Sequence, residues 1–323
     1  MKYKIYKLFP YNYCHIKVSE GRLDRASMFI HSDTLFSGLI NCYTKLFGEK
    51  DLDIFIDNLV ISSLFYGLKF SNQELFFVPK PLLIVKNFDN LKEFKKLNWV
   101  SIKSLEKLLS KFDGESTIFK LDEFIFLNSQ FLITKEEKFT ELKEDIKFVD
   151  TIIEPKVNID RTSYFSKYLY FQEEIMIKKI FINEKLILEP FLYFIVEEPI
   201  EHLTSILNML VEDGIGGERN FGKGVFSFWE EGEIDIPNSS DYGMLLSLTI
   251  PKNEELEKVI FYKLIKKDGF IYYNQPLGLK KIKHFKIQEG SIVKMPFMGQ
   301  NINVSPINDI KVISYGKSFC WPF

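Results

Sequence analysis

The chain has 323 residues, of which 46% are hydrophobic and 15% aromatic, and its formal net charge is −2 at pH 7. This composition is too apolar for a disordered protein, and the length suits about two domains. The near-neutral charge excludes a protein whose whole surface is basic, so any contact with nucleic acid must depend on local patches.

The cysteines and the apolar runs bear on the compartment. Cys14, Cys42 and Cys320 are far apart and form no C-x-x-C pair, which favours a reducing environment. The apolar runs are too short to cross a bilayer, and the N-terminus has no long apolar segment. We therefore expect no signal peptide, no membrane segment and a cytoplasmic location. The four histidines do not have metal-ligand spacing, so we expect no metal and no cofactor.

The first elements are a strand and a helix. Polar and apolar residues alternate from Tyr3 to Phe9, which predicts a strand. A helix follows, with Ser32 or Asp33 as its cap and apolar residues at three-to-four spacing along one face. Gly38 in its middle predicts that a backbone or a ligand approaches closely. His31, just before the helix, could act as a general base or simply hydrogen-bond the cap.

Extended segments and a charged region come next. Leu59 to Leu68 and Leu75 to Val85 are expected to be extended, and Pro79-Lys80-Pro81 is expected to form a surface loop between extended segments. Residues 86–147 contain 12 lysines and 12 acids. This balance predicts a solvated, partly helical insertion more readily than a binding surface for a specific partner.

The following elements complete one structural unit. After a polar segment from Pro155 to Thr162, two strands are expected over Tyr168–Lys178 and Leu186–Val196, as a hairpin with a long turn. A helix over Ile200–Val211 and a strand from Val225 follow. Without the insertion the order is strand, helix, strand, strand, helix, strand. This is the ferredoxin-like order, which RNA recognition motifs also use.

Between that helix and strand lies a glycine-rich loop, Gly214-Ile-Gly-Gly-Glu-Arg-Asn-Phe-Gly-Lys-Gly224, with five glycines in eleven residues. It could be a long turn, or an anion cradle in which backbone N–H groups and two basic side chains surround a phosphate. Part of it matches G-x-x-x-x-G-K-[ST], but Gly224 stands where that motif needs a hydroxyl. The order helix, loop, strand also differs from a nucleotide-hydrolysing loop, which runs from strand to helix.

The pattern then begins again. After an acidic connector from Glu230 to Asp241, we expect a strand over Gly243–Ile250, a helix over Glu254–Ile265, an extended piece over Phe270–Tyr273 and a last strand over Val312–Tyr315. The predicted fold class is α+β with two ferredoxin-like domains. Residues 1–235 would form the first, with an insertion at about 60–160, and residues 236–323 the second and smaller one.

A basic segment lies inside this second domain. Residues 262–286 contain seven lysines and one acid, interleaved with Tyr272, Tyr273 and Phe285. Lysines next to aromatic rings suit single-stranded nucleic acid, because the lysines follow the phosphates and the rings stack on bases. An exposed amphipathic loop would have the same composition, so both interpretations stay open.

Several motifs together resemble the RAMP superfamily. They are the glycine-rich loop, His31-Ser-Asp-Thr-Leu-Phe-Ser-Gly38, Pro79-Lys-Pro81, Asn158-Ile-Asp-Arg161 and Ser314-Tyr-Gly-Lys-Ser-Phe-Cys-Trp-Pro322. Their order, with a second domain after the glycine-rich loop, is similar to the fourth Csm subunit of type III-A CRISPR effector complexes. The resemblance covers nearly the whole chain and is weakest over the insertion.

The resemblance implies a non-catalytic protein that acts in antiviral defence. Such a subunit grips the repeat-derived 5′ tag of the crRNA, caps the backbone filament beside the adjacent backbone Csm subunit, and docks the large polymerase-like Csm subunit. The RNA-binding residues it implies here are Gly214, Gly216, Gly217, Arg219, Asn220, Gly222 and Lys223 of the loop, with His31, Ser32 and Arg161 nearby.

The main alternative is an enzyme, the CRISPR repeat endoribonuclease that processes precursor crRNA. That family shares the fold and uses a histidine for metal-free cleavage, but its glycine-rich loop lies close to the C-terminus. Here 99 residues follow Gly224. The sequence also offers no second strong candidate for a general acid, so binding is favoured over cleavage.

Overall fold

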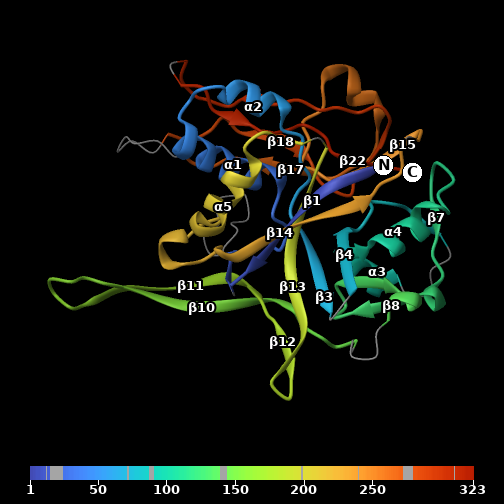
Figure 1. Cartoon of the computed structure of the whole chain (residues 1–323), viewed down its shortest axis with the longest axis horizontal. Coiled ribbons are helices and arrows are strands. Elements are labelled where there is room, and N and C mark those ends of the chain that lie inside the picture. The colour runs from blue at the N-terminus through green and yellow to red at the C-terminus, as the bar shows by residue number, and fades with distance from the viewer. Residues whose placement is uncertain are drawn as a thin grey trace.

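The structure is a mixed α+β fold with several sheets, seen as a ribbon in Figure 1. It is a computed structural model that describes residues 1–11, 13–14, 25–70, 73–86, 91–138, 144–197, 199–238, 240–271, 279–308 and 310–323. Residues 15–24, and both Tyr272 and Tyr273, lie outside the described residues.

Four antiparallel strands form one half of the largest sheet, in the order β14-β1-β13-β3. Their bounds are β1 Lys2–Pro10, β3 Phe65–Phe70, β13 Lys185–Val196 and β14 Phe226–Asp235. Helix α1 (Ser32–Phe47) follows β1, and α5 (Leu203–Asp213) follows β13. With the segments between β3 and β13 set aside, the elements have the order expected from the sequence. A short helix, α2 (Leu52–Asn58), was not expected.

Helix α1 begins at Ser32, which is earlier than a Ser32 or Asp33 cap would allow. Its N-cap is His31, whose carbonyl accepts from Thr34 and Leu35 and whose side chain makes no cap hydrogen bond. A close approach at Gly38 is present, but a side chain makes it and not the expected backbone or ligand: a Cβ built there would lie 3.1 Å from the Leu210 side chain of α5. The glycine therefore lets the two helices pack closely.

The charged insertion is a packed part of the sheet, and the expectation of a solvated insertion is wrong. The sheet continues through β4 (Gln73–Pro79), β6 (Trp99–Ser101), β9 (Phe131–Thr134) and β8 (Phe124–Leu127). Trp99 and Phe131 are fully buried. The expected helical content is present as α3 (Leu91–Lys96) and α4 (Ile102–Leu109), and β5 (Val85–Lys86) pairs with β7 (Thr117–Ile118). Because lysines and acids on the outer faces dominate the composition of this segment, its composition does not reveal the buried core.

The two strands expected as one hairpin belong to two different hairpins. Strand β11 (Ser166–Ile177) pairs with β10 (Val149–Ile159), which covers most of the expected polar segment, whereas β13 pairs with β12 (Ile180–Ile182). Pro155 is tolerated in β10 because this strand is the edge of a three-stranded sheet, β10-β11-β2, with β2 at Tyr13–Cys14. Figure 1 shows the β10–β11 hairpin projecting from the body of the protein.

The C-terminal region contains no α-helix among its described residues, so the helix predicted over Glu254–Ile265 and the second ferredoxin-like unit are wrong. A 3-10 helix at Asn253–Lys258 is followed by β16 (Val259–Phe261) and β17 (Leu264–Lys267). β-Branched and aromatic residues there favour strands. The other strands are β15 (Tyr242–Leu245), β18 (His284–Ile287), β19 (Ile292–Lys294), β20 (Ile302–Asn303), β21 (Ile313–Ser314) and β22 (Cys320–Pro322), with β16-β19-β15-β22 as one sheet.

The Pro79–Pro81 segment joins the two parts of the chain and is not the expected surface loop. Pro79 and Pro81 are buried, and Leu82 N–H donates to the Gly290 carbonyl at 2.7 Å. Gly290 has a φ of +85°, and a Cβ there would lie 2.5 Å from the Lys80 carbonyl oxygen. One hydrophobic core includes residues of both parts, among them Tyr66 and Trp321.

Candidate nucleic-acid interface

The ends of the glycine-rich loop are shaped by the turn itself. Gly214 N–H donates to the Leu210 carbonyl at the end of α5, and Ile215 N–H donates to the Gly224 carbonyl at 2.9 Å. Gly214 and Gly224 have φ values of +74° and +73°, and a Cβ on Gly224 would lie 2.0 Å from the Ile215 oxygen. These two glycines are therefore required for closing the loop, whether or not a ligand binds.

The middle of the loop is open. Residues Arg219–Phe221 form one 3-10 turn, which ends at Gly222 with a φ of +76° and open space around the position of a Cβ. Gly216 also has a positive φ, +94°, and Gly217 is half-buried. Asn220 is exposed and Phe221 is 80% exposed. Arg219 is half-buried, and within the described parts of the chain it forms no ion pair with a carboxylate.

Lys223 has a different environment from the one expected. Its Nζ lies 3.1 Å from Glu154 and 3.3 Å from Glu218, and it also contacts Glu174. Lys156 of β10 contacts Glu218 and lies 3.4 Å from Glu174. We call these five residues the hairpin-base cluster. Burial lowers the pKa of Lys223, and the contact with Glu154 opposes this shift. Lys223 therefore ties the loop to the hairpin and is already neutralised by acids.

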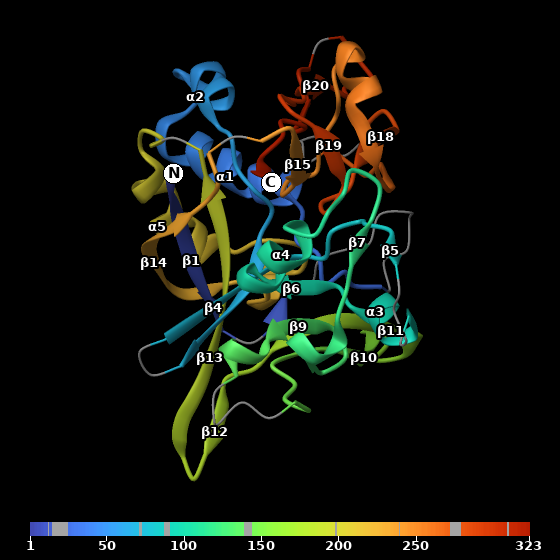
Figure 2. The same cartoon turned by 90° about the vertical axis from the view of Figure 1, so that its right-hand side faces the viewer.

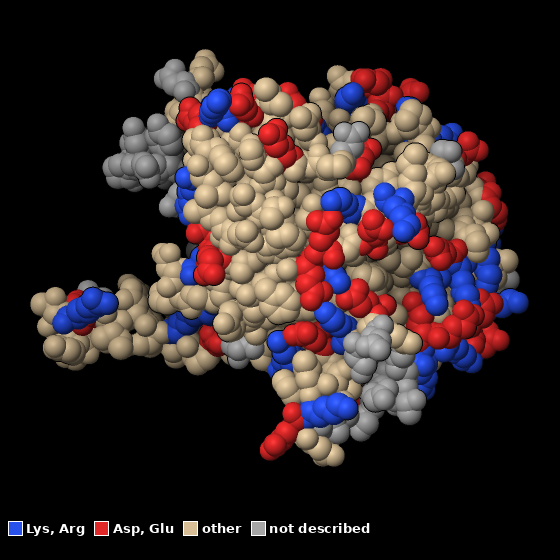
Figure 3. Space-filling view, viewed as in Figure 1, with Lys and Arg blue, Asp and Glu red and all other residues tan. Residues whose placement is uncertain are grey.

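The hairpin exposes many large apolar side chains, both at this cluster and beyond it. They are Ile153, Val157, Ile159, Tyr164, Phe165, Tyr168, Leu169, Tyr170 and Phe171, each at least 46% exposed. In the space-filling view of Figure 3 the projecting arm is largely uncharged. Patches of this extent on a projecting element mark interaction sites.

Arg161 is not brought to the glycine-rich loop. It is exposed in the turn at the tip of the β10–β11 hairpin, five residues beyond Lys156. At about 3.3 Å per residue of strand, this places it roughly 16 Å farther out than the hairpin-base cluster. The sequence-based grouping of Arg161 with the loop therefore joins two separate parts of the projecting surface.

His31 and Ser32 lie inside the protein, at the junction with the C-terminal region. His31 Nδ1 is 2.9 and 3.0 Å from the two oxygens of Glu289, and the Ser63 hydroxyl also donates to Glu289. Ser32 is fully buried, and its hydroxyl accepts from Leu248 N–H at 3.0 Å. These residues position α1 against the C-terminal region and do not face the glycine-rich loop.

Asp33 completes this junction. Its carboxylate lies 3.2 Å from Lys267 and 3.1 Å from Lys286, and the Lys286 side chain is fully buried. Burial opposes ionisation of Asp33, but the charges of Lys267 and Lys286 outweigh it and hold the pKa well below the ordinary value. Burial likewise opposes ionisation of Glu289, and His31 together with Ser63 lowers its pKa. We call His31, Asp33, Lys267, Lys286 and Glu289 the junction network.

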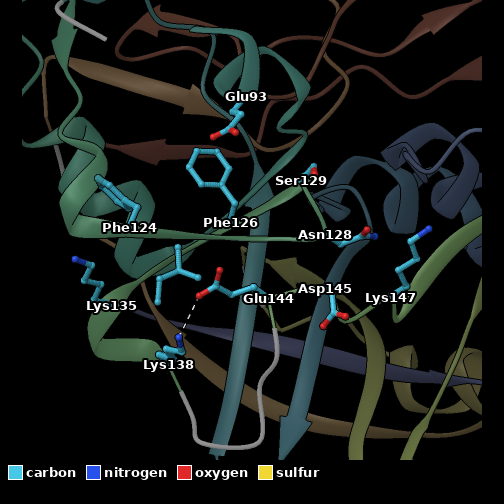
Figure 4. Close-up of a pocket in the computed structure, with 11 residues that line it drawn as sticks. Glu93, Phe124, Phe126, Asn128, Ser129, Lys135, Lys138, Glu144, Asp145 and Lys147 are labelled. Atoms are coloured by element: carbon cyan, nitrogen blue, oxygen red, sulfur yellow. Dashed lines mark hydrogen bonds and ion pairs between the residues drawn. The ribbon is translucent and has the colours of Figure 1, made fainter. Parts of the chain in front are cut away.

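Other candidate sites are few. In the described ranges no three His, Cys, Asp or Glu side chains are grouped as a metal site would require, and no helix there is long and apolar enough to cross a membrane. A cavity of about 940 Å³ lies beside β8, shown in Figure 4 with the Lys138–Glu144 ion pair across it. None of the RNA-binding residues predicted from the sequence lines it.

Sequence reasoning missed the acidic partners of Lys223 and the aromatic surface of the hairpin. The alternation of polar and apolar residues along β10 could have indicated a strand there, but only a polar segment was expected from Pro155 to Thr162. The pairing of Glu174 with Lys223 joins residues 49 positions apart, and no local pattern indicates such a contact.

Comparison with known proteins gives the family. Residues 16–227 match the model of the RAMP superfamily, and residues 238–323 match the model of the CRISPR Csm4 C-terminal domain. The chain is 29% identical to the "CRISPR system Cms protein Csm4" of Methanocaldococcus jannaschii, over 94% of this chain and 93% of that protein. It is 26% identical to the protein of the same name from Thermococcus onnurineus, over 81% of each.

Solved structures agree in fold. A chain in the crystal structure of the Csm3-Csm4 subcomplex in the type III-A CRISPR-Cas interference complex has a TM-score of 0.66 and 26% identity, over 99% of both chains. A chain of the Csm1-Csm4 cassette in complex with cA4, at 19% identity, has a TM-score of 0.57. The protein therefore belongs to the RAMP superfamily and is a homologue of the Csm4 proteins over 94% of its length.

Proposed function

We propose that the protein is the crRNA-binding subunit of a type III-A CRISPR interference complex. It holds the 5′ repeat-derived tag without catalysing cleavage, and it docks a large Csm1-type subunit and an adjacent Csm3-type backbone subunit. Similarity to Csm4 along nearly the whole chain supports this, as do the similar solved structures, which are a Csm3-Csm4 subcomplex and a Csm1-Csm4 cassette.

The observation that carries the proposal is the open middle of the glycine-rich loop at the base of the projecting hairpin. Gly216 and Gly217 offer backbone groups and Asn220 offers a polar side chain to the RNA. Gly222, whose N–H donates to the Arg219 carbonyl, leaves open space for the RNA to approach. Arg219 supplies charge for a phosphate. Phe221 at 80% exposure offers a ring on which a base stacks. Gly214 and Lys223 shape this surface from within.

The geometry around His31 supports binding over the endoribonuclease alternative. A general base must reach the proton that it removes, and His31 is buried with its Nδ1 held by Glu289. For His31 and Ser32 we propose a structural role. For the domains we propose a ferredoxin-like unit over residues 1–235, supported by the strand order β14-β1-β13-β3, and a separate C-terminal unit over residues 236–323.

The exposed hairpin supports a place in an assembly. Both faces of the projecting hairpin expose apolar and aromatic side chains, and the contact of these side chains with water is unfavourable. A partner that covers the hairpin would remove them from water. The β10–β11 hairpin is therefore the surface for a neighbouring subunit.

Fluorescence anisotropy with labelled RNA that carries the repeat-derived tag tests the proposal. Arg219→Ala should weaken binding and lower the magnitude of the salt slope by about 0.7, because one phosphate contact with a single strand is lost. Phe221→Ala should weaken binding about fivefold or more through lost stacking. The control is Lys311→Ala, which removes an exposed lysine paired with Asp53.

Unchanged affinity and unchanged salt slope in both loop variants would contradict the tag assignment. Incubation with labelled repeat RNA, with and without magnesium or manganese, tests the absence of catalysis. Specific cleavage that disappears in His31→Ala would favour the endoribonuclease instead.

A further inference from the structure

A second surface lies on the other side of the molecule from the glycine-rich loop. It centres on a groove of about 650 Å³ between residues 80–85 and the end of β16. In Figure 2, β5, α3 and β18 lie to one side of the molecule, and α5 and β14 lie to the other. Lys80, Lys95 and Lys263 line the groove together with apolar side chains, and no lining residue is acidic.

Lys80 is the most informative residue of this groove. Its Nζ donates to the Phe94 carbonyl at 2.9 Å and lies 4.8 Å from the centre of the Phe94 ring. It has no ion pair with a carboxylate in the described ranges. Burial lowers the pKa of Lys80 to about 8. A half-buried ammonium with only a carbonyl and a ring as partners provides a place for an anion.

The β17–β18 hairpin continues this surface. The pairing of Ile265 with Lys286 and of Lys267 with His284 puts these four residues on one face, where Asp33 neutralises both lysines. Leu264, Lys266 and Phe285 share the opposite face, because side chains alternate along a strand.

This opposite face is exposed at Leu264 and Phe285 and half-buried at Lys266, whereas Ile287, which pairs with Leu264, is buried. Phe285 is 61% exposed, and Tyr262, at the mouth of the groove, is 57% exposed. Lys263, Lys266 and Lys283 have no carboxylate partner among the residues that the structure describes. Nearby, Lys280 lies 5.3 Å from the centre of the exposed Phe270 ring. Unpaired lysines therefore alternate with exposed rings from the groove along the hairpin.

We propose that the Lys80 groove and the outer face of the β17–β18 hairpin form a binding site for single-stranded RNA, separate from the glycine-rich loop. One base enters the groove and stacks against Tyr262, while Lys80 and Lys263 contact the backbone phosphates on either side of that nucleotide. The strand then continues over Lys266 and Phe285. An acidic polypeptide would pair with the lysines but would leave the rings exposed, which is why the ligand is assigned to nucleic acid.

The test measures binding of a fluorescein-labelled single-stranded RNA of twelve nucleotides to the full chain at several salt concentrations. Lys263→Glu with Lys266→Glu should lower the magnitude of the salt slope by about 1.4, for two phosphate contacts. Tyr262→Ala should raise Kd about fivefold or more. Lys80→Met should raise Kd as well. Lys294→Glu on β19 is the matched control, since Lys294 is an exposed lysine of the same region but does not line the groove.

A second measurement does not depend on the variants. Because the pKa of Lys80 is low, an amine-acylating reagent near pH 8 should modify it, and bound RNA should protect it, as read by mass spectrometry. Uridine monophosphate should protect only at much higher concentration if a strand is the ligand. Protection by polyglutamate equal to that by RNA would overturn the assignment to nucleic acid.

Unchanged Kd and salt slope in the Lys263/Lys266 double variant would overturn the proposal, and melting curves of each variant check folding. Failure of this site and failure of the tag assignment are distinguishable. If Arg219→Ala weakens binding and the groove variants do not, the glycine-rich loop is supported and the groove is rejected. The reverse result supports the groove and rejects the loop.

Discussion

Two clusters of charged residues connect different parts of the molecule: one lies at the base of a projecting hairpin and the other between packed elements. The hairpin-base cluster joins the glycine-rich loop to a projecting hairpin, with three glutamates around two lysines, and one buried oxygen of Glu174 has no partner in the structure as described. The junction network joins α1 to the C-terminal region, with Asp33 and Glu289 facing Lys267, Lys286 and His31.

The difference shows that a basic residue near a glycine-rich loop is not automatically a phosphate ligand. Lys223 and His31 were both expected to contact RNA, and both have carboxylate partners inside the protein. It also predicts that damage at the junction destabilises the whole fold, whereas damage at the loop remains local, because the junction lies between packed elements.

The largest effect is expected at the junction. Asp33→Asn leaves Lys267 and the fully buried Lys286 without a compensating charge, so the free energy of unfolding should fall by about 3–5 kcal/mol. Urea unfolding followed by circular dichroism measures this. Asp53→Asn is the control, because Asp53 is exposed in its pair with Lys311, and it should leave the midpoint unchanged. Equal midpoints for the two variants would contradict the role of the junction network.

A smaller effect is expected inside the glycine-rich loop, where two glycines with similar φ differ in their surroundings. Gly222→Ala should cost about 1 kcal/mol, since only the left-handed backbone is penalised. Gly224→Ala should cost more, about 2 kcal/mol or above, because its Cβ would also collide with the Ile215 oxygen. Thermal melts compare the two variants. An equal loss of stability would show that the closed end of the loop relaxes freely.

The smallest effect is the pH dependence of the stability that Asp33 contributes. Because the folded-state pKa of Asp33 lies below its ordinary value of 3.8, its stabilising contribution is fully present above about pH 4 and is lost as pH falls further. The difference in unfolding free energy between the wild type and Asp33→Asn should therefore be constant from pH 7 to pH 5 and should narrow below pH 4. A difference that stays constant to pH 3 would show that the Asp33 charge is not responsible.

The sequence by itself determined the elements that local patterns specify. The alternation from Tyr3, the three-to-four spacing after Ser32 and the glycines at 214–224 predicted β1, α1 and the turn before β14, because side-chain period and backbone freedom are local properties. Only the tertiary structure decided which strands pair. Strand β11 joins β10 and not β13. Strand β16 forms where a helix was expected, because its β-branched and aromatic residues find a partner strand in β19.

The same distinction holds for the candidate site. The sequence indicated Gly216, Arg219 and Asn220 as residues that can meet a ligand, and they lie in the open part of the loop. It could not indicate that Glu154 and Glu174 neutralise Lys223. Nor could it indicate that Glu289 holds His31, because these two residues are 258 positions apart in the chain. Whether a charge faces a ligand or an internal partner depends on the packing of distant segments, and only the folded chain determines it.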